Sequence, residues 1–271
     1  MYNIFMVSLV YMVAGLSSRF GGKIKQFAQV GPNNETLIEV SLNQALQSPF
    51  KNIVFVVGDK TEQPFKEKFG NEYMGVPIKY VKQSFDPAMR DKPWGTCDAV
   101  VAAKDVVDNY FVVCNGDDLY GPNSFTFLYN WTEWNSNPAT LGYKLDTVLP
   151  QEGSVNRGIF KINENSIVKE IKEMLGIERS NLSLGLNVPV SMNIFCLTKT
   201  EVDLLETQLI KFKGTHKEDR KIECYLPVEL SNLILENKIK MTLLDAPDKW
   251  IGITNPEDES IVRDFIKRWY I

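Results

Sequence analysis

The chain has 271 residues, of which 44% are hydrophobic and 24% are charged, and this ordinary globular composition excludes disordered and fibrous proteins. A chain of this length buries about 75% of the surface that its unfolded form exposes, so it needs no disulfide or metal to hold its core. The net charge of −4, without a dense run of Lys and Arg, argues against a duplex nucleic-acid binder but leaves room for a local basic pocket that binds small anions.

The four cysteines stand far apart without a Cys-x-x-Cys pair, and His216 is the only histidine. This argues against structural zinc and fits a reduced, cytoplasmic compartment. Residues 1–16 are strongly apolar, yet no Lys or Arg precedes the apolar run as in a signal peptide. The run is also shorter than the roughly 20 residues of a membrane span. We therefore expect a buried first strand and no membrane association.

Strand and helix patterns alternate through the first half of the chain. Thr36 and Glu39 have the spacing of a capping box, and Pro49 ends the helix that follows. The order predicts an α/β protein with a parallel, doubly wound sheet, and such sheets bind ligands at the carboxyl ends of their strands. Three loops, 14–26, 83–95 and 115–121, are therefore expected to converge. The expected strands are 5–13, 53–57, 76–83 and 110–114, and the expected helices are 37–47, 62–69 and one from about residue 96.

The second half is less regular. A hairpin is expected across 155–162 and 166–171, a strand over 190–197, and helices over 199–212, 227–237 and 257–269. Residues 176–187 carry the least pattern and are expected to form a loop. Since the sequence has no repeat, low-complexity tract or clear linker, we expect a single domain over residues 1–271.

The first motif that carries chemistry directly follows the first strand and reads Ala14-Gly15-Leu16-Ser17-Ser18-Arg19-Phe20-Gly21-Gly22-Lys23-Ile24-Lys25. Small residues let the backbone approach a ligand closely, and clustered N–H groups bind phosphate oxygens. Arg19 and Lys25 add two cations suited to phosphate. The alternative is a flexible glycine turn with solvated cations. The position after a buried strand favours a triphosphate-binding loop, although the loop is not a Walker A motif.

The second motif is Asn115-Gly116-Asp117-Asp118, at the end of an apolar strand. Carboxylates in this position can hold Mg²⁺, which binds through a few carboxylates together with phosphate oxygens. An Asp-rich turn is the alternative, because Asp is common in turns. The expected position beside the phosphate loop favours a metal site.

The third motif is Gln83 followed by Pro93-Trp94-Gly95-Thr96. A glutamine amide has a donor and an acceptor, so it can recognise the edge of a base. Thr96 is equally well explained as a helix N-cap. Trp250, later in the chain, is expected to pack in the core or an interface.

Together and in this order, the three motifs resemble those of the sugar-phosphate nucleotidyltransferase family. That family has an AGLGSR-like loop with a downstream lysine, a glutamine before a GTA-like segment, and an Asp-bearing GD element. Segments Ser191–Phe195, Tyr225–Pro227 and Asp248–Thr254 look like a poorly characterised bacterial branch of it, so the resemblance covers nearly the whole chain. The matching motifs here read Ala14–Arg19 with Lys25, Gln83 with Gly95-Thr96-Cys97, and Gly116-Asp117.

The resemblance implies a Rossmann-like nucleotidyltransferase fold, with a mixed, mostly parallel central sheet flanked by helices. The half 1–145 would bind the nucleotide and the half 146–271 the acceptor. The implied reaction joins an NTP, with UTP or dTTP ahead of CTP, to a phosphorylated small molecule, foremost a sugar 1-phosphate, and releases pyrophosphate. Mg²⁺ is the implied cofactor, and a homo-oligomer is compatible with the sequence.

The resemblance also implies a role for each matching residue. Arg19 and Lys25 would stabilise the triphosphate and the leaving pyrophosphate. Asp117, with Asp248, would hold Mg²⁺. The nucleotide would contact Ala14, Gly15, Leu16, Ser17, Ser18, Gln83, Gly95 and Thr96, and the acceptor would contact Asp118, Gly158, Glu173, Asn193 and Lys249.

Two departures from the family pattern leave alternatives open. Gly252 stands where the family usually has a metal-binding aspartate. Either Asp248 or Asp118 compensates for that aspartate, or one metal ion suffices. Met174 stands where the family often has a lysine that binds the sugar phosphate. Either Lys172 or Lys249 substitutes for that lysine, or the acceptor is a different molecule. The alternatives are a cytidylyltransferase for a non-sugar phosphate such as phosphocholine, and a nucleotide-binding module without turnover.

Overall fold

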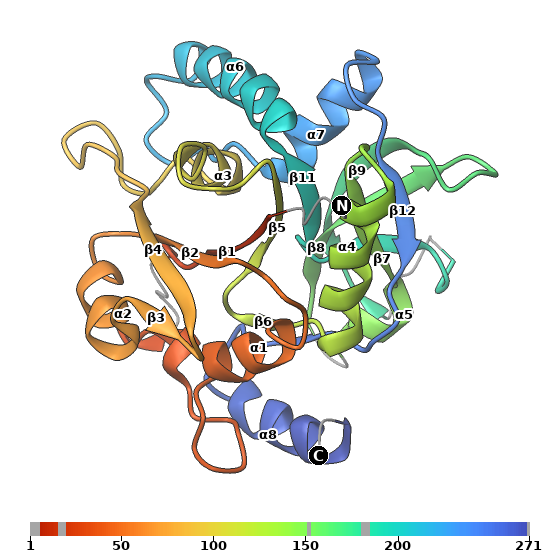
Figure 1. Cartoon of the computed structure of the whole chain (residues 1–271). Coiled ribbons are helices and arrows are strands. Elements are labelled where there is room, and N and C mark those ends of the chain that lie inside the picture. Colours follow the sequence, from red (N-terminus) through yellow and green to blue (C-terminus); the bar gives the residue numbers. More distant parts are fainter. Residues whose placement is uncertain (1–5, 16–19, 151–152, 180–184, 270–271) are drawn as a thin grey trace, which may run out of the picture.

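The computed structural model describes residues 6–15, 20–150, 153–179 and 185–269 (Figure 1). In this part of the chain, one 11-stranded sheet runs in the order β3-β4-β2-β1-β5-β11-β7-β10-β8-β9, with β12 beside β7. The sheet strands are β1 (Val7–Met12), β2 (Asn52–Val57), β3 (Glu72–Tyr73), β4 (Val76–Lys82), β5 (Tyr110–Asn115), β7 (Ala139–Lys144), β8 (Val155–Ile162), β9 (Val168–Ile177), β10 (Pro189–Ser191), β11 (Phe195–Thr198) and β12 (Thr242–Asp245).

The sheet is mixed, as the sequence predicts. Strands β4, β2, β1 and β5 are parallel, which is the arrangement expected of the alternating first half. In the second half, β11 runs antiparallel between β5 and β7, and β10, β8 and β9 continue the sheet with antiparallel pairs. The single strand expected over 190–197 is wrong, because Asn193 takes a positive φ of 57° and separates β10 from β11.

Helices cover both faces of the sheet (Figure 1). One face packs against α3 (Thr96–Ala102), α6 (Lys199–Thr215) and α7 (Leu226–Leu235). The other face packs against α1 (Leu37–Ala45), α2 (Glu62–Phe69) and α4 (Pro122–Trp134), with the short α5 (Leu145–Val148) near its end. The capping box of α1 is confirmed, because the backbone N–H and the hydroxyl of Thr36 donate to Glu39 Oε2 at 2.8 and 2.5 Å.

A third, smaller core lies beneath the C-terminal helix α8 (Asp258–Trp269). There Val262 and Ile266 pack with Leu37 of α1 and with Leu119 of β6 (Asp118–Leu119). Strand β6 pairs antiparallel with β13 (Ile251–Gly252). This pairing places the C-terminal segment beside the second sequence motif. In the described part of the chain, no helix combines the length and apolarity that a membrane crossing requires.

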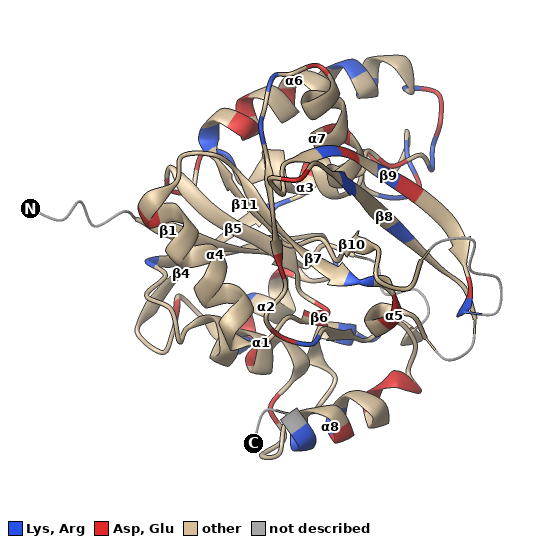
Figure 2. Ribbon diagram, turned by 90° about the vertical axis from the view of Figure 1, so that its right-hand side faces the viewer, with Lys and Arg blue, Asp and Glu red and all other residues tan. Residues whose placement is uncertain are grey.

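Charged residues are interspersed along α6, α8 and the β8–β9 hairpin (Figure 2). Neighbours of opposite sign often pair, as Lys161 of β8 does with Glu170 of β9 at 2.5 Å. The four cysteines are buried and free. The four thiols therefore pack within the hydrophobic cores.

Candidate active site

The three expected loops meet where β1, β4 and β5 end, and the predicted convergence is confirmed. They line a first cavity of about 460 Å³. A second cavity of about 540 Å³ adjoins it and shares Asn115, Asp117 and Asn193 with it. The predicted residues in the first cavity are Ala14, Gly15, Lys25, Gln83, Gly95, Thr96, Asp117 and Asn193, and those in the second are Asp117, Asp118, Gly158, Glu173 and Asn193.

Lys25 and Asp117 bring the first two motifs together. Lys25 opens the short 3₁₀ helix η2 (Lys25–Phe27), and its ammonium forms an ion pair with the Asp117 carboxylate. Gly116 allows this approach, because a Cβ there would overlap the Val13 side chain at the end of β1. Four residues of the predicted phosphate loop, Leu16, Ser17, Ser18 and Arg19, lie outside the described residues.

The Gln83 amide is held in one orientation. Its Nε2 donates to the Gly95 carbonyl and to Asp98 Oδ2, both at 2.8 Å. Asp98 is held in turn by Lys213, whose Nζ lies 2.5 Å from Oδ1. Two acceptors face Nε2, so the amide has to present its NH₂ group to them and its carbonyl Oε1 elsewhere. Gln83 lines the first cavity, and its two hydrogen bonds fix the orientation of its amide.

Gly95 and Thr96 fix the third motif against a distant segment. Gly95 has φ 98°, and a Cβ there would lie 2.7 Å from the carbonyl oxygen of Cys224. The interpretation of Thr96 as the N-cap is wrong, because Gly95 takes that position and Thr96 is the first residue of α3. The Thr96 hydroxyl accepts from the Leu226 N–H at 2.9 Å.

Asp118 is almost fully buried between the second motif and the C-terminal strand β13. Its Oδ2 accepts from Asn115 Nδ2 at 2.9 Å and from the Tyr120 hydroxyl at 3.2 Å. Burial, and then the neighbouring Asp117 carboxylate, raise the pKa of Asp118 to about 7. Across the β6–β13 pair stands Gly252, where a Cβ would overlap Asp118 Oδ1. The Asp118 carboxylate thus fills the space that a side chain at position 252 would take.

The structure does not bring Asp248 or Lys249 into either cavity, and Lys172 is also absent from their linings. Asp248 instead accepts from the Ser124 N–H at 2.8 Å and from Asn123 Nδ2 at 2.9 Å. Both oxygens therefore bind the first turn of α4, where a carboxylate is favoured by the exposed N–H groups. Sequence spacing could not reveal this cap, because α4 begins more than a hundred residues earlier.

Arg157 is a site residue that the sequence did not single out. It lines the second cavity beside Gly158, and its guanidinium carbon lies 5.5 Å from the centre of the Trp250 ring. Burial lowers the pKa of Arg157, while the nearby carboxylates of Asp118 and Glu173 oppose that shift. Burial also raises the pKa of Glu173. The only sequence signal for Arg157 was its position next to Gly158.

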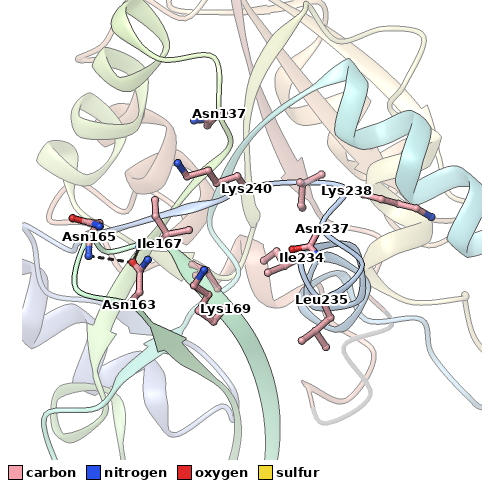
Figure 3. A pocket seen from close by; sticks show the side chains of 12 residues that line it. Asn137, Asn163, Asn165, Ile167, Lys169, Ile234, Leu235, Asn237, Lys238 and Lys240 are labelled. Carbon is pink, nitrogen blue, oxygen red and sulfur yellow. Dashed lines mark hydrogen bonds between the residues drawn. The ribbon is translucent and has the colours of Figure 1, made fainter.

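A third cavity, of about 890 Å³, lies beside the starts of β7 and β12, away from the ends of β1, β4 and β5 (Figure 3). The turn at its rim is closed by Asn163 Oδ1, which accepts from the Asn165 N–H at 3.1 Å. Lys169 and Lys240 are among its lining residues. None of the predicted site residues lines it, so size alone does not identify the site here.

Comparisons with known proteins bear on the fold and the family. Among solved structures, an inositol-1-phosphate CTP transferase from T. maritima is similar, with 16% sequence identity, a TM-score of 0.70, and coverage of 99% of this chain and 97% of that one. A UDP-glucose pyrophosphorylase complexed with UDP-glucose has 15% identity and a TM-score of 0.68, with coverage of 97% and 99%. At such identities the likeness shows a shared fold. Among curated proteins there is no match.

The family assignment rests on the sequence itself. A family model described as "Nucleotidyl transferase" matches residues 22–173, which is more than half of the chain. The match includes Lys25, Gln83, Asp117 and Arg157, and so covers both adjoining cavities in part. The chain therefore belongs to the nucleotidyl transferase family, and it is a nucleotidyltransferase.

Proposed function

We propose that the protein transfers a nucleotidyl group from UTP or dTTP to a sugar 1-phosphate, with Mg²⁺ bound, and releases pyrophosphate. The observation that carries this proposal is the pair of adjoining cavities that share Asp117 and Asn193. A transfer between two substrates needs two subsites with the reacting groups at their junction. The first cavity has phosphate-binding and base-recognising groups, and the second has hydroxyl, amide and carboxylate groups suited to a polyol.

The orientation of Gln83 supports a uracil or thymine base. Its Oε1 acts as an acceptor, since Nε2 is engaged by Gly95 and Asp98. Uracil and thymine carry an N–H at ring position 3, whereas cytosine carries a lone pair there. Cytosine can donate only through its exocyclic 4-amino group, so the proposal places Oε1 opposite ring position 3, where an acceptor favours uracil or thymine.

Asp117 and Asp118 are the residues proposed to hold Mg²⁺. The two carboxylates adjoin in the second cavity, where burial and then the Asp117 charge raise the pKa of Asp118 to about 7. Among the described residues, no three His, Cys, Asp or Glu side chains gather as a metal cluster. Two carboxylates fit Mg²⁺, which completes its coordination with water and phosphate oxygens. When bound, Mg²⁺ would neutralise negative charge on the phosphates.

The protein's own residues would then align the reactants. The attacking atom is an oxygen of the acceptor phosphate, which is already anionic, so the reaction needs no strong general base or covalent intermediate. Lys25 would stabilise negative charge on the triphosphate from its place beside Asp117. Gln83 would fix the base, and the rigid 93–96 segment would hold the nucleotide against α3. Catalysis in this scheme is alignment and charge neutralisation.

The test is pyrophosphate release with Mg²⁺. UTP, dTTP, CTP, ATP and GTP are each combined with glucose 1-phosphate, inositol 1-phosphate and phosphocholine. We expect release with UTP or dTTP and a sugar 1-phosphate. Release with CTP and phosphocholine alone would select the cytidylyltransferase alternative instead, and NTP binding without release across the panel would contradict the proposal.

The control variant is Asp117→Asn. It removes the shared carboxylate but keeps the side-chain shape, and the side chain is only 20% exposed. We expect turnover to fall by at least about 100-fold, the loss typical when a group that stabilises transition-state charge is removed. Circular dichroism should show an unchanged fold. Turnover close to that of the unaltered protein would remove Asp117 from the proposed metal site.

A further inference from the structure

The second cavity has an unusual charge distribution for a site that receives an anion. Three carboxylates line it, those of Asp117, Asp118 and Glu173. Among the described residues that line it, Arg157 is the only cation. A phosphorylated acceptor would be repelled by the carboxylates unless a cation faces it. With Mg²⁺ proposed at Asp117 and Asp118, Arg157 is the cation that the described lining residues themselves offer to an anionic acceptor.

The hydrogen bonds of Arg157 leave part of its guanidinium available. Nη1 donates to the Asn156 carbonyl at 2.9 Å, and Nη2 donates to the Val148 carbonyl at 3.2 Å. A guanidinium has five N–H donors, so three remain, and one of them is the N–H of Nε. Nε is buried without a partner among the described residues. An Nε–H and an Nη–H side by side match the two oxygens of a phosphate or carboxylate.

Two more residues of the same cavity have unsatisfied buried atoms. Trp250 Nε1, a donor, and Asn193 Oδ1, an acceptor, are both buried without a partner among the described residues. Buried polar atoms are nearly always paired, and those that are not require an explanation. Here two donors and one acceptor belong to residues of one cavity. A ligand that carries both an oxyanion and a hydroxyl group offers the two kinds of partner that these three atoms lack.

We propose that Arg157 and Trp250 bind an oxyanion of the acceptor in the second cavity while Asn193 accepts a hydrogen bond from one of its hydroxyl groups. The acceptor class is thus a phosphorylated polyol. This inference deepens the proposed function and rests on it. The guanidinium carbon lies 5.5 Å from the centre of the Trp250 ring, within the range of a cation–π interaction.

The experiment compares Arg157→Gln with Lys161→Gln. Lys161 lies on the same strand and pairs with Glu170 on an exposed surface, so it gives the same charge change away from the cavity. We expect the KM for glucose 1-phosphate to rise by about 10- to 100-fold in R157Q, as when a charged hydrogen bond is lost. The KM for UTP should change less than about twofold, because its subsite keeps its contacts. K161Q should leave both values unchanged.

A binding measurement separates the ligand from the reaction. Isothermal titration calorimetry with glucose 1-phosphate, inositol 1-phosphate and inorganic phosphate should show tighter binding of the two polyol phosphates than of inorganic phosphate. R157Q should weaken all three. Equal binding of inorganic phosphate would mean that the cavity recognises the oxyanion alone and would overturn the polyol assignment.

The outcomes distinguish failure of this inference from failure of the proposed function. If the unaltered protein releases no pyrophosphate with any acceptor, the proposed function fails. If it is active and R157Q leaves the acceptor KM unchanged, Arg157 only neutralises its neighbouring carboxylates and the inference fails. Should R157Q not fold, Arg157→Lys and Trp250→Phe test the same contacts with smaller changes. We expect each to raise the acceptor KM by about 3- to 10-fold, and unchanged values in both would overturn the inference.

Discussion

Gln83 is the side chain proposed to select the base. Asp98 and the Gly95 carbonyl fix its Nε2, and Lys213 fixes Asp98 from α6. In the proposed site, base selection would therefore depend on a network that reaches from the end of β4 to α6. The amide cannot rotate to donate to cytosine without losing two hydrogen bonds of its own.

We predict that Gln83→Ala lowers kcat/KM for UTP by about 10-fold, since one hydrogen bond to the base is lost. The value for CTP should fall less, so the UTP-to-CTP ratio decreases. Pyrophosphate release with each nucleotide at a fixed acceptor concentration measures this ratio. The matched control is Gln63→Ala on α2, whose amide donates to Glu67 at the exposed surface. An unchanged ratio in Gln83→Ala would mean that other groups select the base.

Some of these contacts could be predicted from the sequence and others could not. Lys25 and Asp117 belong to loops that follow two neighbouring strands, so the topology alone predicted their meeting. Arg157 gave no such signal, because its role depends on a cavity completed by Trp250 from the end of the chain. Asp248 was expected to compensate for the aspartate that Gly252 replaces, but its oxygens cap α4.

The β6–β13 pair is the element that links the second motif to the C-terminal part of the chain. It holds Gly252 opposite Asp118. A side chain at position 252 would displace the Asp118 carboxylate. A Cβ built on Gly252 would overlap Asp118 Oδ1 and lie 2.8 Å from the Trp250 ring. Where the family usually has an aspartate, this chain has Gly252, and the Asp118 carboxylate of the facing strand fills that space.

We predict that Gly252→Ala displaces Asp118 and lowers the free energy of unfolding by about 1–3 kcal/mol, the usual cost of overpacking. Binding of Mn²⁺, used as a spectroscopic substitute for Mg²⁺, should weaken at least about 10-fold if a charged ligand is lost. Urea unfolding and electron paramagnetic resonance measure the two effects. The control is Gly214→Ala in α6, where an added Cβ meets no atom within 4 Å. Stability and Mn²⁺ affinity equal to those of the unaltered protein would show that Asp118 does not need this space.

The elements themselves were predicted best where the sequence alternates regularly. Strands β1, β2, β4 and β5 are short apolar runs between helices, and the structure has them close to the expected bounds. The sequence analysis did not find α4, β7 or β12. The buried residues of α4 have a helical spacing, but its exposed Phe127 and Trp134 obscure the pattern. The break at Asn193 depends on two different strand partners on its two sides.

Across the whole molecule, the two expected halves of the chain are interleaved. Strand β11, which belongs to the second half, lies between β5 and β7 of the first half. It is fully buried, with Phe195 and Leu197 at 0% exposure. The main core also includes residues from both halves, such as Phe55 and Val190. Both cavities likewise take residues from the two halves, so a boundary at residue 145 does not divide the folding unit.

We predict that a fragment of residues 1–145 does not fold, because removal of β11 exposes the edges of β5 and β7 and the apolar residues on both. The full chain should unfold in one transition, with the same urea midpoint by circular dichroism and by tryptophan fluorescence. The fragment should show neither a cooperative transition nor dispersed NMR signals, and adding residues 146–271 as a separate chain should restore both if the missing strand is the cause. Two separate transitions in the full chain, or a folded fragment, would mean that the halves are independent domains and that the shared sheet does not couple them.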